Sequence, residues 1–571
     1  MLPSARARRT ANVEIPLLLK RPVPVIKVKH SELSRLVGRD LKHSEIEELA
    51  YGLAGEVEGV EGEEISLKWE PIRPDLFSVE GFARACRGLL GLQEGALKYV
   101  VAPPRWTLRI DSSVRAVRPV MVAARITDVK LSDETVRSIV DLQEKLDASI
   151  GRGRKRVSIG LHDPSNLHPP FEYRCVPWEA SAFIPLGHSV KMTPKEIVEK
   201  HEGGKQHGQL ISAAPAAPIL VDSRGQVLSL PPIINGELTR VTSQSKELFL
   251  DVTGLEHESC RRVLNIICCA LADRGASIEA VSIAGEGATK HESTPDLSSE
   301  RWELPFSAVT RVLGAPATPR EAAAALRRAG HDANENGPLI EVDAPAYRAD
   351  ILHVVDLVED VAIGLGYDTI PTSLPRHAVF ARRLGDVGQE DSIASSLIGQ
   401  GFTEISTLMV SNAATAARNF ETPGVGAPAP GAAISNPITM DHTHLRASLL
   451  PDLMNSFRIN RHRDMPQRIF EIGLVFDGSR EHRRAGFAAM HARASFTECK
   501  SHAESLLRDL RVVADVDAAA KPGFISGRCA SAIVAGKEVG FFGEIHPAVL
   551  ENFELAAPVI ACEVDIARLF P

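Results

Sequence analysis

The sequence predicts a multidomain α+β protein, and three observations support this fold class. The chain has 571 residues, and because one domain usually takes about 100 to 200 residues, several domains are expected. Segments in which apolar residues alternate stand beside segments in which they recur every three or four positions, so both strands and helices are expected. Hydrophobic residues make up 44% and charged residues 24% of the chain, as in ordinary globular proteins.

Residues 25–100 predict a small α/β unit. Within it, Ser44 to Glu47 has the pattern of a capping box at a helix start, and ISLKWE has the alternation of a strand. A proline-bounded arm then leads into a second helix. On this arm, Arg73 and Asp75 are expected to cap and to form a surface ion pair, with a functional role as the alternative.

Residues 101–290 are rich in predicted strands, beginning with WTLRID and PVMVAARITDVKL. Residues 133–150 predict an amphipathic helix that ends at GRGRKR, residues 151–156. For this basic loop, a solvated surface and a phosphate contact are both open. Further on, Thr193 to Glu196 has the N-cap, the first-position proline and the glutamate of a capping box.

Short polar side chains gather near apolar strands between residues 218 and 254. They are Asn235, Glu237, Thr239, Asp251 and Thr253. A set of this kind suits a pocket that recognises a small polar ligand. For each residue taken singly, turn or cap duty is the alternative.

Residues 295–375 predict a small module in which strand, helix, strand and helix follow one another. RWELPF is its first strand, and Thr318 to Glu321 is a capping box that opens an alanine-rich helix closed by Gly330. Modules of this size often bind nucleic acid or another protein, and the fold alone does not decide between them.

This module carries four carboxylates in the stretch YRADILHVVDLVEDVAIGLGY. Asp350 lies on an extended arm, and Asp356, Glu359 and Asp360 stand at positions i, i+3 and i+4 of the helix that follows, so the latter three share one face. Like charges this close call for a compensating cation or a basic partner. A Mg²⁺ ion held by one or two carboxylates and waters meets that need, whereas acids that face water near a helix start are the alternative.

Residues 376–571 predict a unit in which long strands alternate with one buried helix. QRIFEIGLVF and ACEVDIARLF are its clearest strands, residues 387–400 predict a helix closed by Gly401, and residues 411–434 predict a loop. The pattern indicates an antiparallel sheet with helices on one face.

Charge, cysteines and the first residues bear on the compartment. A net charge of −8 argues against a uniformly basic nucleic-acid binder, although a local basic surface remains compatible with it. The eight scattered cysteines form no CxxC pair, which is typical of reduced core cysteines in a cytosolic protein. No run approaches the ~20 apolar residues of a membrane span. Residues 1–24 are basic and are expected to be a disordered extension in the cytoplasm rather than a targeting peptide.

Several stretches together resemble the β subunits of phenylalanyl-tRNA synthetases, in their shorter archaeal and eukaryotic form. Their order and spacing match over almost the whole chain, which is more specific than any lone motif. The stretches are RPDLFSVEGFARACRGLLG, VRPVMVAARITDVKL, LQEKLDASIGRGRKRVSIGLHD, VDSRGQVLSLPPIINGELTRVT, LFLDVTG, YRADILHVVDLVEDVAIGLGY, NPITMDHTHLRASLLPDL, QRIFEIG and FGEIHPAVLENF.

The resemblance implies an (αβ)2 heterotetramer that joins phenylalanine to tRNA(Phe) with ATP, the synthetic site lying on the α subunit. It also implies that residues 101–290 form an editing domain that hydrolyses mischarged tyrosyl-tRNA(Phe). The family assigns Mg²⁺ to the carboxylates that match Asp350, Asp356, Glu359 and Asp360. Its editing pocket lies in the region that matches Ser229, Asn235, Asp251 and Thr253.

For residues 376–571 the resemblance implies a class II synthetase-like sheet. Enzymes of that class hold ATP with one arginine on a strand-loop-strand motif and another on a glycine-rich helix start. QRIFEIG keeps the strand, but nothing near FGEIHPAVLENF offers a glycine-rich turn followed by arginine. The unit is therefore expected to lack the ATP clamp and to dock the α subunit. Ile72 stands where an asparagine is more typical of the family.

Two other functions remain open. One is a free-standing aminoacyl-tRNA hydrolase, in which the flanking domains only bind RNA. The other is an RNA-binding scaffold without any hydrolytic activity. The long C-terminal unit weighs against the first, because an isolated hydrolase would not need a catalytic-like domain.

Overall fold

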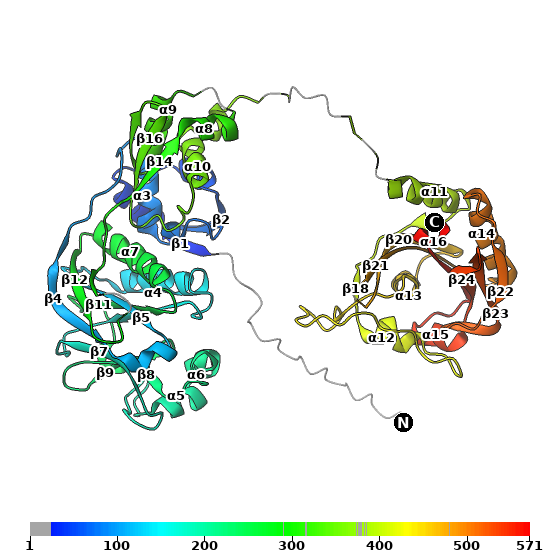
Figure 1. Ribbon diagram of the computed structural model, residues 1–571, viewed down its shortest axis with the longest axis horizontal. Helices are drawn as coiled ribbons and strands as arrows, with labels where there is room; N and C mark the ends of the chain where they lie inside the picture. Colours follow the sequence, from blue (N-terminus) through cyan, green and yellow to red (C-terminus); the bar gives the residue numbers. More distant parts are fainter. Residues whose placement is uncertain are drawn as a thin grey trace. The chain divides into compact units, whose positions relative to one another are not determined.

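The computed structural model describes residues 24–570 except 289–290, 315–316, 373, 375–379, 382, 384 and 479. The chain divides into two compact units, residues 1–374 and residues 375–571 (Figure 1). The predicted basic extension, apart from Pro24, and the predicted boundary at 375–376 lie outside the described residues. In the described part of the chain, no helix is both long and apolar enough to cross a membrane.

The first unit begins with a three-stranded antiparallel sheet in the order β1-β3-β2. Helix α2 begins at His43 and its first residues are capped by Glu45, whose carboxylate accepts a hydrogen bond from the Lys42 amide at 3.0 Å. The predicted cap at Ser44 is therefore wrong by two positions. The elements are β1 (Val25–Lys29), α1 (His30–Val37), α2 (His43–Gly52), β2 (Gly55–Glu61), β3 (Glu64–Trp69) and α3 (Val79–Leu89).

A ten-stranded sheet follows, in the order β10-β9-β8-β7-β4-β12-β5-β11-β6, with β13 paired to β12. Its strands are β4 (Val101–Ile110), β5 (Val120–Thr127), β6 (Val157–His162), β7 (Phe171–Val176), β8 (Ala217–Val221), β9 (Val227–Leu230), β10 (Ile234–Asn235), β11 (Leu248–Gly254), β12 (Ser277–Ala284) and β13 (Glu292–Thr294). The helices are α4 (Asp133–Ala148), α5 (Pro194–Lys200), α6 (Glu202–His207) and α7 (His257–Asp273).

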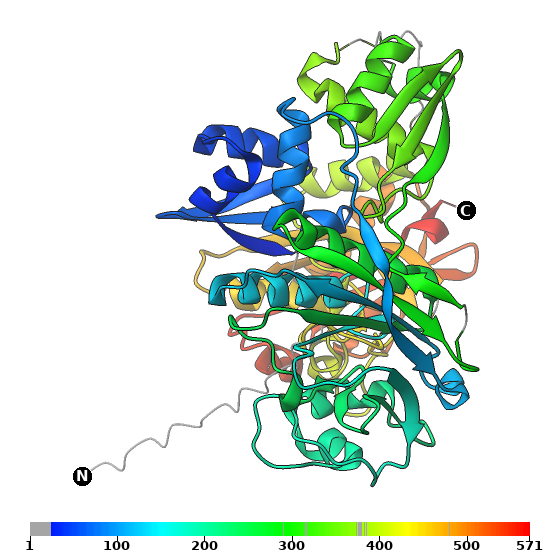
Figure 2. The same cartoon turned by 90° about the vertical axis from the view of Figure 1, so that its left-hand side faces the viewer.

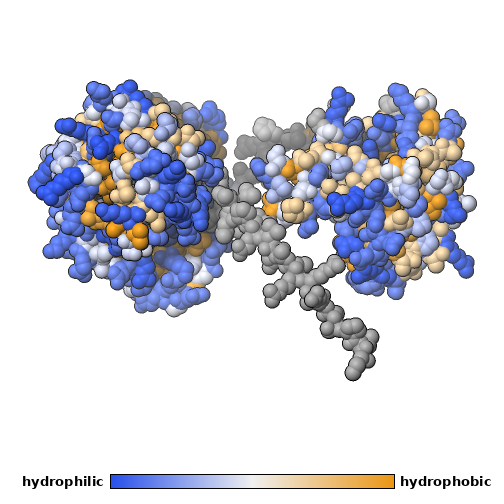
Figure 3. Space-filling view, turned by 90° about the horizontal axis from the view of Figure 1, so that it is seen from below, coloured by the Kyte–Doolittle hydropathy of each residue, from blue (hydrophilic) through white to orange (hydrophobic). Residues whose placement is uncertain are grey.

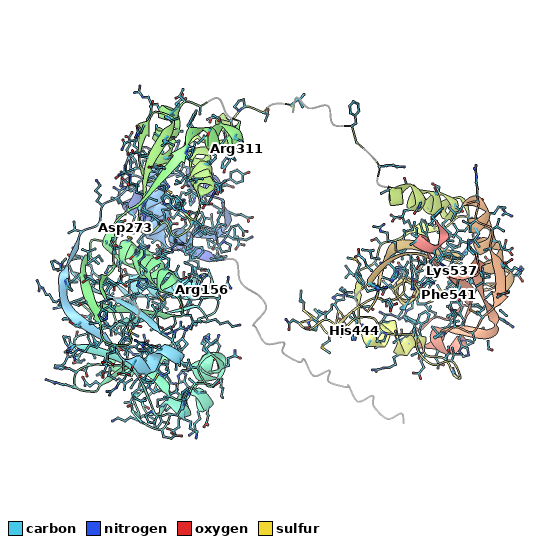
Figure 4. All side chains as sticks on the ribbon, in the orientation of Figure 1. Arg156, Asp273, Arg311, His444, Lys537 and Phe541 are labelled. Carbon is cyan, nitrogen blue, oxygen red and sulfur yellow. The ribbon has the colours of Figure 1, made fainter. Side chains whose placement is uncertain are left out.

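Helices α4 and α7 cover one face of this sheet (Figure 2). They pack on the alternate apolar residues of β5, β6 and β11 because a strand presents successive side chains to opposite faces. Asp273, labelled in Figure 4, fixes the end of α7 by accepting hydrogen bonds from Tyr99 and Arg84. The Arg84 guanidinium also lies 3.8 Å from the centre of the Tyr347 ring, so α7, α3 and the later arm are held together.

The opposite face of the sheet is enclosed because the sheet curls. Its two edge strands, β10 and β6, come together where the Asn235 amide of β10 donates to the Leu161 carbonyl of β6 at 3.1 Å. The enclosed face holds a second core that includes Phe171, Tyr173 and Phe249. Polar side chains placed on this face are therefore largely removed from solvent.

The first unit ends with another three-stranded antiparallel sheet, in the order β14-β16-β15. Its elements are β14 (Glu300–Pro305), α8 (Phe306–Leu313), α9 (Pro319–Arg328), β15 (Asp332–Asn336), β16 (Leu339–Ala344) and α10 (Val354–Leu365). The predicted order missed α8 and one strand of the β15–β16 hairpin. The arm between β16 and α10 carries Asp350.

The second unit is a seven-stranded sheet in the order β17-β20-β21-β25-β24-β23-β22. All neighbours are antiparallel except β17 and β20. The strands are β17 (Thr403–Glu404), β20 (Gln467–Asp477), β21 (Arg480–Met490), β22 (Asp515–Ala518), β23 (Phe524–Val534), β24 (Lys537–Ile545) and β25 (Val559–Asp565), with a separate pair β18 (Val410–Ser411) and β19 (His444–Leu445).

Helices cover both faces of this second sheet, so the prediction of helices on one face is wrong. Phe487 of β21 joins a core with Leu507 of α14, whereas its neighbour Ala488 joins a core with Leu453 of α13. The end of β21 is apolar on both sides, which indicates burial on both faces. The helices are α11 (Gly385–Gly399), α12 (Ala413–Ala416), α13 (Leu450–Ile459), α14 (Phe496–Asp509), α15 (Pro547–Asn552) and α16 (Ile566–Leu569).

The surfaces of both units mix polar and apolar side chains (Figure 3).

All eight cysteines are free thiols; seven are buried and Cys175 is partly buried. This agrees with the expectation of reduced core cysteines.

Candidate functional site: a carboxylate-lined cleft and an enclosed polar row

The four predicted carboxylates lie on the arm before α10 and on α10 itself, and all four line one cleft of about 1220 Å³. The walls of this cleft also include residues from the first small sheet, from the end of α4 and from α7, among them Glu70, Lys145, Arg152 and Arg262. Side chains of both charge signs therefore face the same space.

Arg348, which comes two residues before Asp350, neutralises two of the four carboxylates. Its guanidinium donates to both oxygens of Asp350, at 2.9 and 2.7 Å, and to Asp360 at 2.6 Å. Arg348 and Asp360 are buried, and His331 lies 2.7 Å from the same Asp360 oxygen. Burial alone would raise the pKa of Asp360, but Arg348 and His331 hold it below its usual range.

The other two carboxylates have different surroundings. Asp356 caps α10, because one of its oxygens accepts hydrogen bonds from the amides of Leu352 and His353 at 2.8 and 2.7 Å. Glu359 is exposed, and the pKa of Glu359 is raised by partial burial and then by Asp360, Asp356 and Asp350. Glu359 is thus the carboxylate at which a cation would relieve the most repulsion.

Arg73 and Asp75 form a buried pair rather than the predicted surface pair. The Arg73 guanidinium donates to both oxygens of Asp75, at 2.9 and 2.8 Å, and Asp75 is 1% exposed. Arg73 also lies 3.9 Å from Asp350. The predicted need for a basic partner near Asp350 is therefore met within the chain by two arginines.

The residues present fit a Mg²⁺ ion only in part. Asp350 and Asp360 already bind Arg348, and the described residues contain no group of three His, Cys, Asp or Glu side chains that could hold a metal ion. Asp356 and Glu359 stay available as one or two carboxylate ligands of a hydrated Mg²⁺.

The basic loop at residues 151–156 is partly committed to internal contacts. Arg154 lies 3.1 Å from Asp147 and donates to the carbonyls of Pro232 and Ile233. Arg156, labelled in Figure 4, pairs with Glu256. Arg152 and Lys155 are exposed. These two side chains of the loop are therefore the ones available for a phosphate contact.

The second candidate site is a row of polar side chains on the enclosed face of the large sheet. Asp251 of β11 is paired with Ala123 of β5 and with Gly160 of β6, and it is 2% exposed. One Asp251 oxygen lies 2.8 Å from His162 Nε2, and His162 Nδ1 lies 2.8 Å from the Thr239 hydroxyl. All three of these side chains are buried.

Thr253 continues the row on the same face of β11. Arg118 Nε donates to the Thr253 hydroxyl at 3.1 Å, and another Arg118 nitrogen donates to the Thr253 carbonyl at 2.9 Å. Burial lowers the pKa of Arg118. Thr253 is therefore held by a buried arginine.

Ser229 and Asn235 approach the row from the other edge of the sheet. They are cross-strand partners on β9 and β10, and the Asn235 amide reaches the carbonyl of Leu161, the residue before His162. The Ser229 hydroxyl is buried and has no hydrogen-bond partner in the described structure. The four predicted residues thus lie on β9, β10 and β11 of one curled sheet. Glu237 instead pairs with the exposed Arg240.

Sequence reasoning missed His162, Gly160 and Arg118. A signal for the first two was present, because Ser158, Gly160 and His162 alternate with Val157, Ile159 and Leu161 along β6. That period of two places the small and polar residues on one face and the apolar residues on the other.

The second unit contains arginines that are engaged by buried glutamates. Arg446 lies 2.8 Å from Glu471 of β20, and Arg484 of β21 lies 3.2 Å from Glu563 of β25. Glu471 and Glu563 are 2% and 1% exposed. Arg446 is buried and its Nε and Nη1 are both engaged, so it is not free to bind a phosphate bidentately. Arg484 is engaged through Nη1 only.

Comparisons with known proteins cover almost the whole chain. Residues 302–367 match the family described as tRNA synthetase B5 domain, and residues 370–566 match the one described as Phenylalanyl tRNA synthetase beta chain CLM domain. The phenylalanine–tRNA ligase beta subunit of Archaeoglobus fulgidus is 37% identical over 552 residues, covering 96% of this chain and 99% of that protein.

Two further comparisons agree. The phenylalanine–tRNA ligase beta subunit of Methanocaldococcus jannaschii is 38% identical over 562 residues, covering 95% of this chain and 100% of that protein. The crystal structure of an N-terminal fragment of the phenylalanyl-tRNA synthetase beta subunit from Pyrococcus horikoshii aligns with a TM-score of 0.58 at 35% identity, covering 60% of this chain and 100% of the fragment. The chain belongs to the family of phenylalanine–tRNA ligase beta subunits.

Proposed function

We propose that the chain works with an α-type partner, as an (αβ)2 complex, in the ATP-dependent attachment of phenylalanine to tRNA(Phe). The observation that carries this proposal is the identity of 35 to 38% to curated beta subunits over at least 95% of the chain. A match of this extent includes the second unit, which a free-standing hydrolase would not need.

The second unit, in this proposal, is a class II synthetase-like sheet that docks the α subunit and does not bind ATP itself. Its support is the state of Arg446 and Arg484, each of which is held by a buried glutamate. A phosphate clamp needs an arginine whose forked donors are free to meet the phosphate oxygens. The synthetic site is accordingly assigned to the α-type partner.

We also propose that the enclosed polar row hydrolyses mischarged tyrosyl-tRNA(Phe). An apolar pocket for phenylalanine rejects an added hydroxyl by only about 100-fold. A second pocket with a carboxylate such as Asp251 can accept a hydrogen bond from that hydroxyl and so selects tyrosine. The nucleophile in this proposal is a water molecule that the surrounding polar groups position.

Mg²⁺ is proposed to bind at the carboxylate-lined cleft. Asp356 and Glu359 would hold it, with further ligands from water or from the partner chain, and its chemistry would be to neutralise the carboxylate repulsion. Asp350 and Asp360 would take part only if Arg348 released them.

The decisive experiment measures ATP-dependent charging of tRNA(Phe) with phenylalanine, first by the chain alone and then by its complex with a co-expressed α-type partner. Charging by the complex alone is the expected result. If neither charges and the lone chain still hydrolyses tyrosyl-tRNA(Phe), the chain is a free-standing hydrolase. If no hydrolysis is seen either, the RNA-binding scaffold is the better account.

A further inference from the structure

The enclosed polar row contains a chain of hydrogen bonds that ends on the Asp251 carboxylate. Thr239 lies at the start of this chain, His162 in the middle and Asp251 at the end, with both distances 2.8 Å. A carboxylate oxygen accepts hydrogen bonds, so Nε2 of His162 donates to Asp251. Nδ1 is then the acceptor for the Thr239 hydroxyl, which also has the Gly236 carbonyl within 3.1 Å.

Gly160 leaves the space in which this contact forms. A Cβ atom at Gly160 would lie 2.9 Å from His162 Nε2 and still closer to the bonded Asp251 oxygen. The carboxylate and the imidazole therefore meet directly above the bare backbone of β6. Any other residue at position 160 would push the two side chains apart.

The hydrogen bond uses only one oxygen of Asp251. Among the hydrogen bonds of the described residues, this one ends on Oδ1 and none ends on Oδ2. The Ser229 hydroxyl, on β9 of the same curled sheet, is buried and has no partner. Buried polar groups normally find partners, because leaving one unpaired costs about 1 to 3 kcal/mol. The unpaired Ser229 hydroxyl indicates that a polar ligand supplies its partner, and Oδ2 of Asp251 has the capacity to accept a hydrogen bond from such a ligand.

We propose that His162 is a positioning residue for Asp251, with Thr239 fixing the imidazole in turn. His162 holds Oδ1 so that Oδ2 accepts the hydrogen bond of a phenolic hydroxyl, the group by which a tyrosyl ester differs from a phenylalanyl ester. This inference rests on the proposed editing function and deepens it. His162 acts through Asp251 and does not touch the ester that is hydrolysed.

Two variants of one side chain separate the positioning role from a purely structural one. The amide nitrogen of Gln reaches about as far as Nε2 of histidine, so His162→Gln keeps a donor toward Asp251. The amide of Asn reaches only about as far as Nδ1, so His162→Asn loses that donor. Both variants place an uncharged amide at the same buried position, which makes their effects on folding comparable.

The experiment measures kcat and KM for hydrolysis of tyrosyl-tRNA(Phe) by the full-length chain, with phenylalanyl-tRNA(Phe) as the competing substrate. His162→Asn is expected to lower kcat/KM for the tyrosyl ester by roughly 10- to 100-fold, the range for a hydrogen bond to a charged group. His162→Gln is expected to retain most of the activity, and Thr239→Val to lose an intermediate share. His291→Gln, at an exposed histidine, is the control and should match the wild type.

The outcomes distinguish this inference from the proposed function. If the wild-type chain hydrolyses tyrosyl-tRNA(Phe) and His162→Asn does so equally well, the positioning role is overturned and editing stands. Equal losses in His162→Gln and His162→Asn, with a matching loss of thermal stability, would reduce His162 to a structural residue. If the wild-type chain hydrolyses neither ester, editing itself fails, and the role of His162 fails with it.

Discussion

Asp147, near the end of α4, is a buried carboxyl with poor support for its charge. Its side chain is 6% exposed, and Arg154 Nε lies 3.1 Å from one oxygen. Within the described structure, neither oxygen accepts a well-formed hydrogen bond. Burial raises the pKa of Asp147 to about 7, although Arg154 and Arg118 act in the opposite direction. An aspartate in an unfolded chain titrates near pH 3.9.

This difference in pKa between the folded and the unfolded chain predicts that the first unit becomes less stable as the pH rises. The folded chain holds the Asp147 proton more tightly than the unfolded chain, so the stabilisation is complete below about pH 4 and is lost as the pH rises through about 7. Asp147→Asn, which cannot ionise, should therefore gain stability relative to the wild type between pH 5 and pH 8, by up to about 1.4 kcal/mol per pH unit below 7. Urea unfolding at each pH measures this.

Asp141 provides the control for that comparison. It lies on the same helix, its side chain is 50% exposed, and it pairs with Lys145. Asp141→Asn should change the free energy of unfolding by less than about 0.5 kcal/mol at every pH. A constant difference between wild type and Asp147→Asn from pH 5 to pH 8 would contradict the assignment.

For single residues, the sequence predicted some members of the candidate site but not their partners. The spacing of Asp356, Glu359 and Asp360 predicted a shared need for positive charge, and within the described structure an arginine meets it only at Asp360. The sequence did not identify Arg348 as the partner, although it stands two residues before Asp350, because the partner depends on how the arm turns. Asp251 and His162 are 89 residues apart, and only the pairing of β11 with β6 brings them together.

At the scale of elements, two of the three predicted helix capping boxes, each contained in four consecutive residues, were confirmed. Thr318 and Glu321 form the expected capping box at α9: the Glu321 amide donates to the Thr318 hydroxyl at 3.3 Å, and the Thr318 amide donates to Glu321 at 2.7 Å. Thr193 and Glu196 do the same at α5. The capping box predicted at Ser44 was wrong, because the N-cap residue is Lys42 and its amide donates to the Glu45 carboxylate. One sequence pattern can therefore be compatible with more than one helix start.

The α9 box leads to a prediction about local stability. Thr318→Ala removes the acceptor for the Glu321 amide and should destabilise the first unit by about 1 kcal/mol. Native-state hydrogen exchange of the first-turn amides of α9 is the direct measurement. Thr310→Ala within α8 is the matched control, since its hydroxyl bonds only the Ser307 carbonyl and alanine is the better helix former. Equal faster exchange in both variants would contradict a capping role.

At the scale of the whole molecule, the α+β class and the mainly antiparallel sheet of the second unit were predicted from the sequence, but the extent of the sheets was not. A ten-stranded sheet that joins strands from residue 101 to residue 294 depends on long-range pairing, which local periodicity does not encode. The second unit was expected to have helices on one face because its long strands alternate along the chain with one buried helix. The second half of β21 is in fact buried on both sides.

The second unit gives the last prediction, which concerns ATP. Arg446 and Glu471 are both buried and lie 2.8 Å apart, and separating such a pair costs about 3 to 5 kcal/mol. A nucleotide would have to recover that cost before it gained anything from the arginine. Calorimetric titration of the chain alone with Mg-ATP should therefore show no binding tighter than about 1 mM, while the complex with an α-type partner should bind. Micromolar binding by the lone chain, abolished by Arg484→Ala, would mean that this unit keeps a working phosphate clamp.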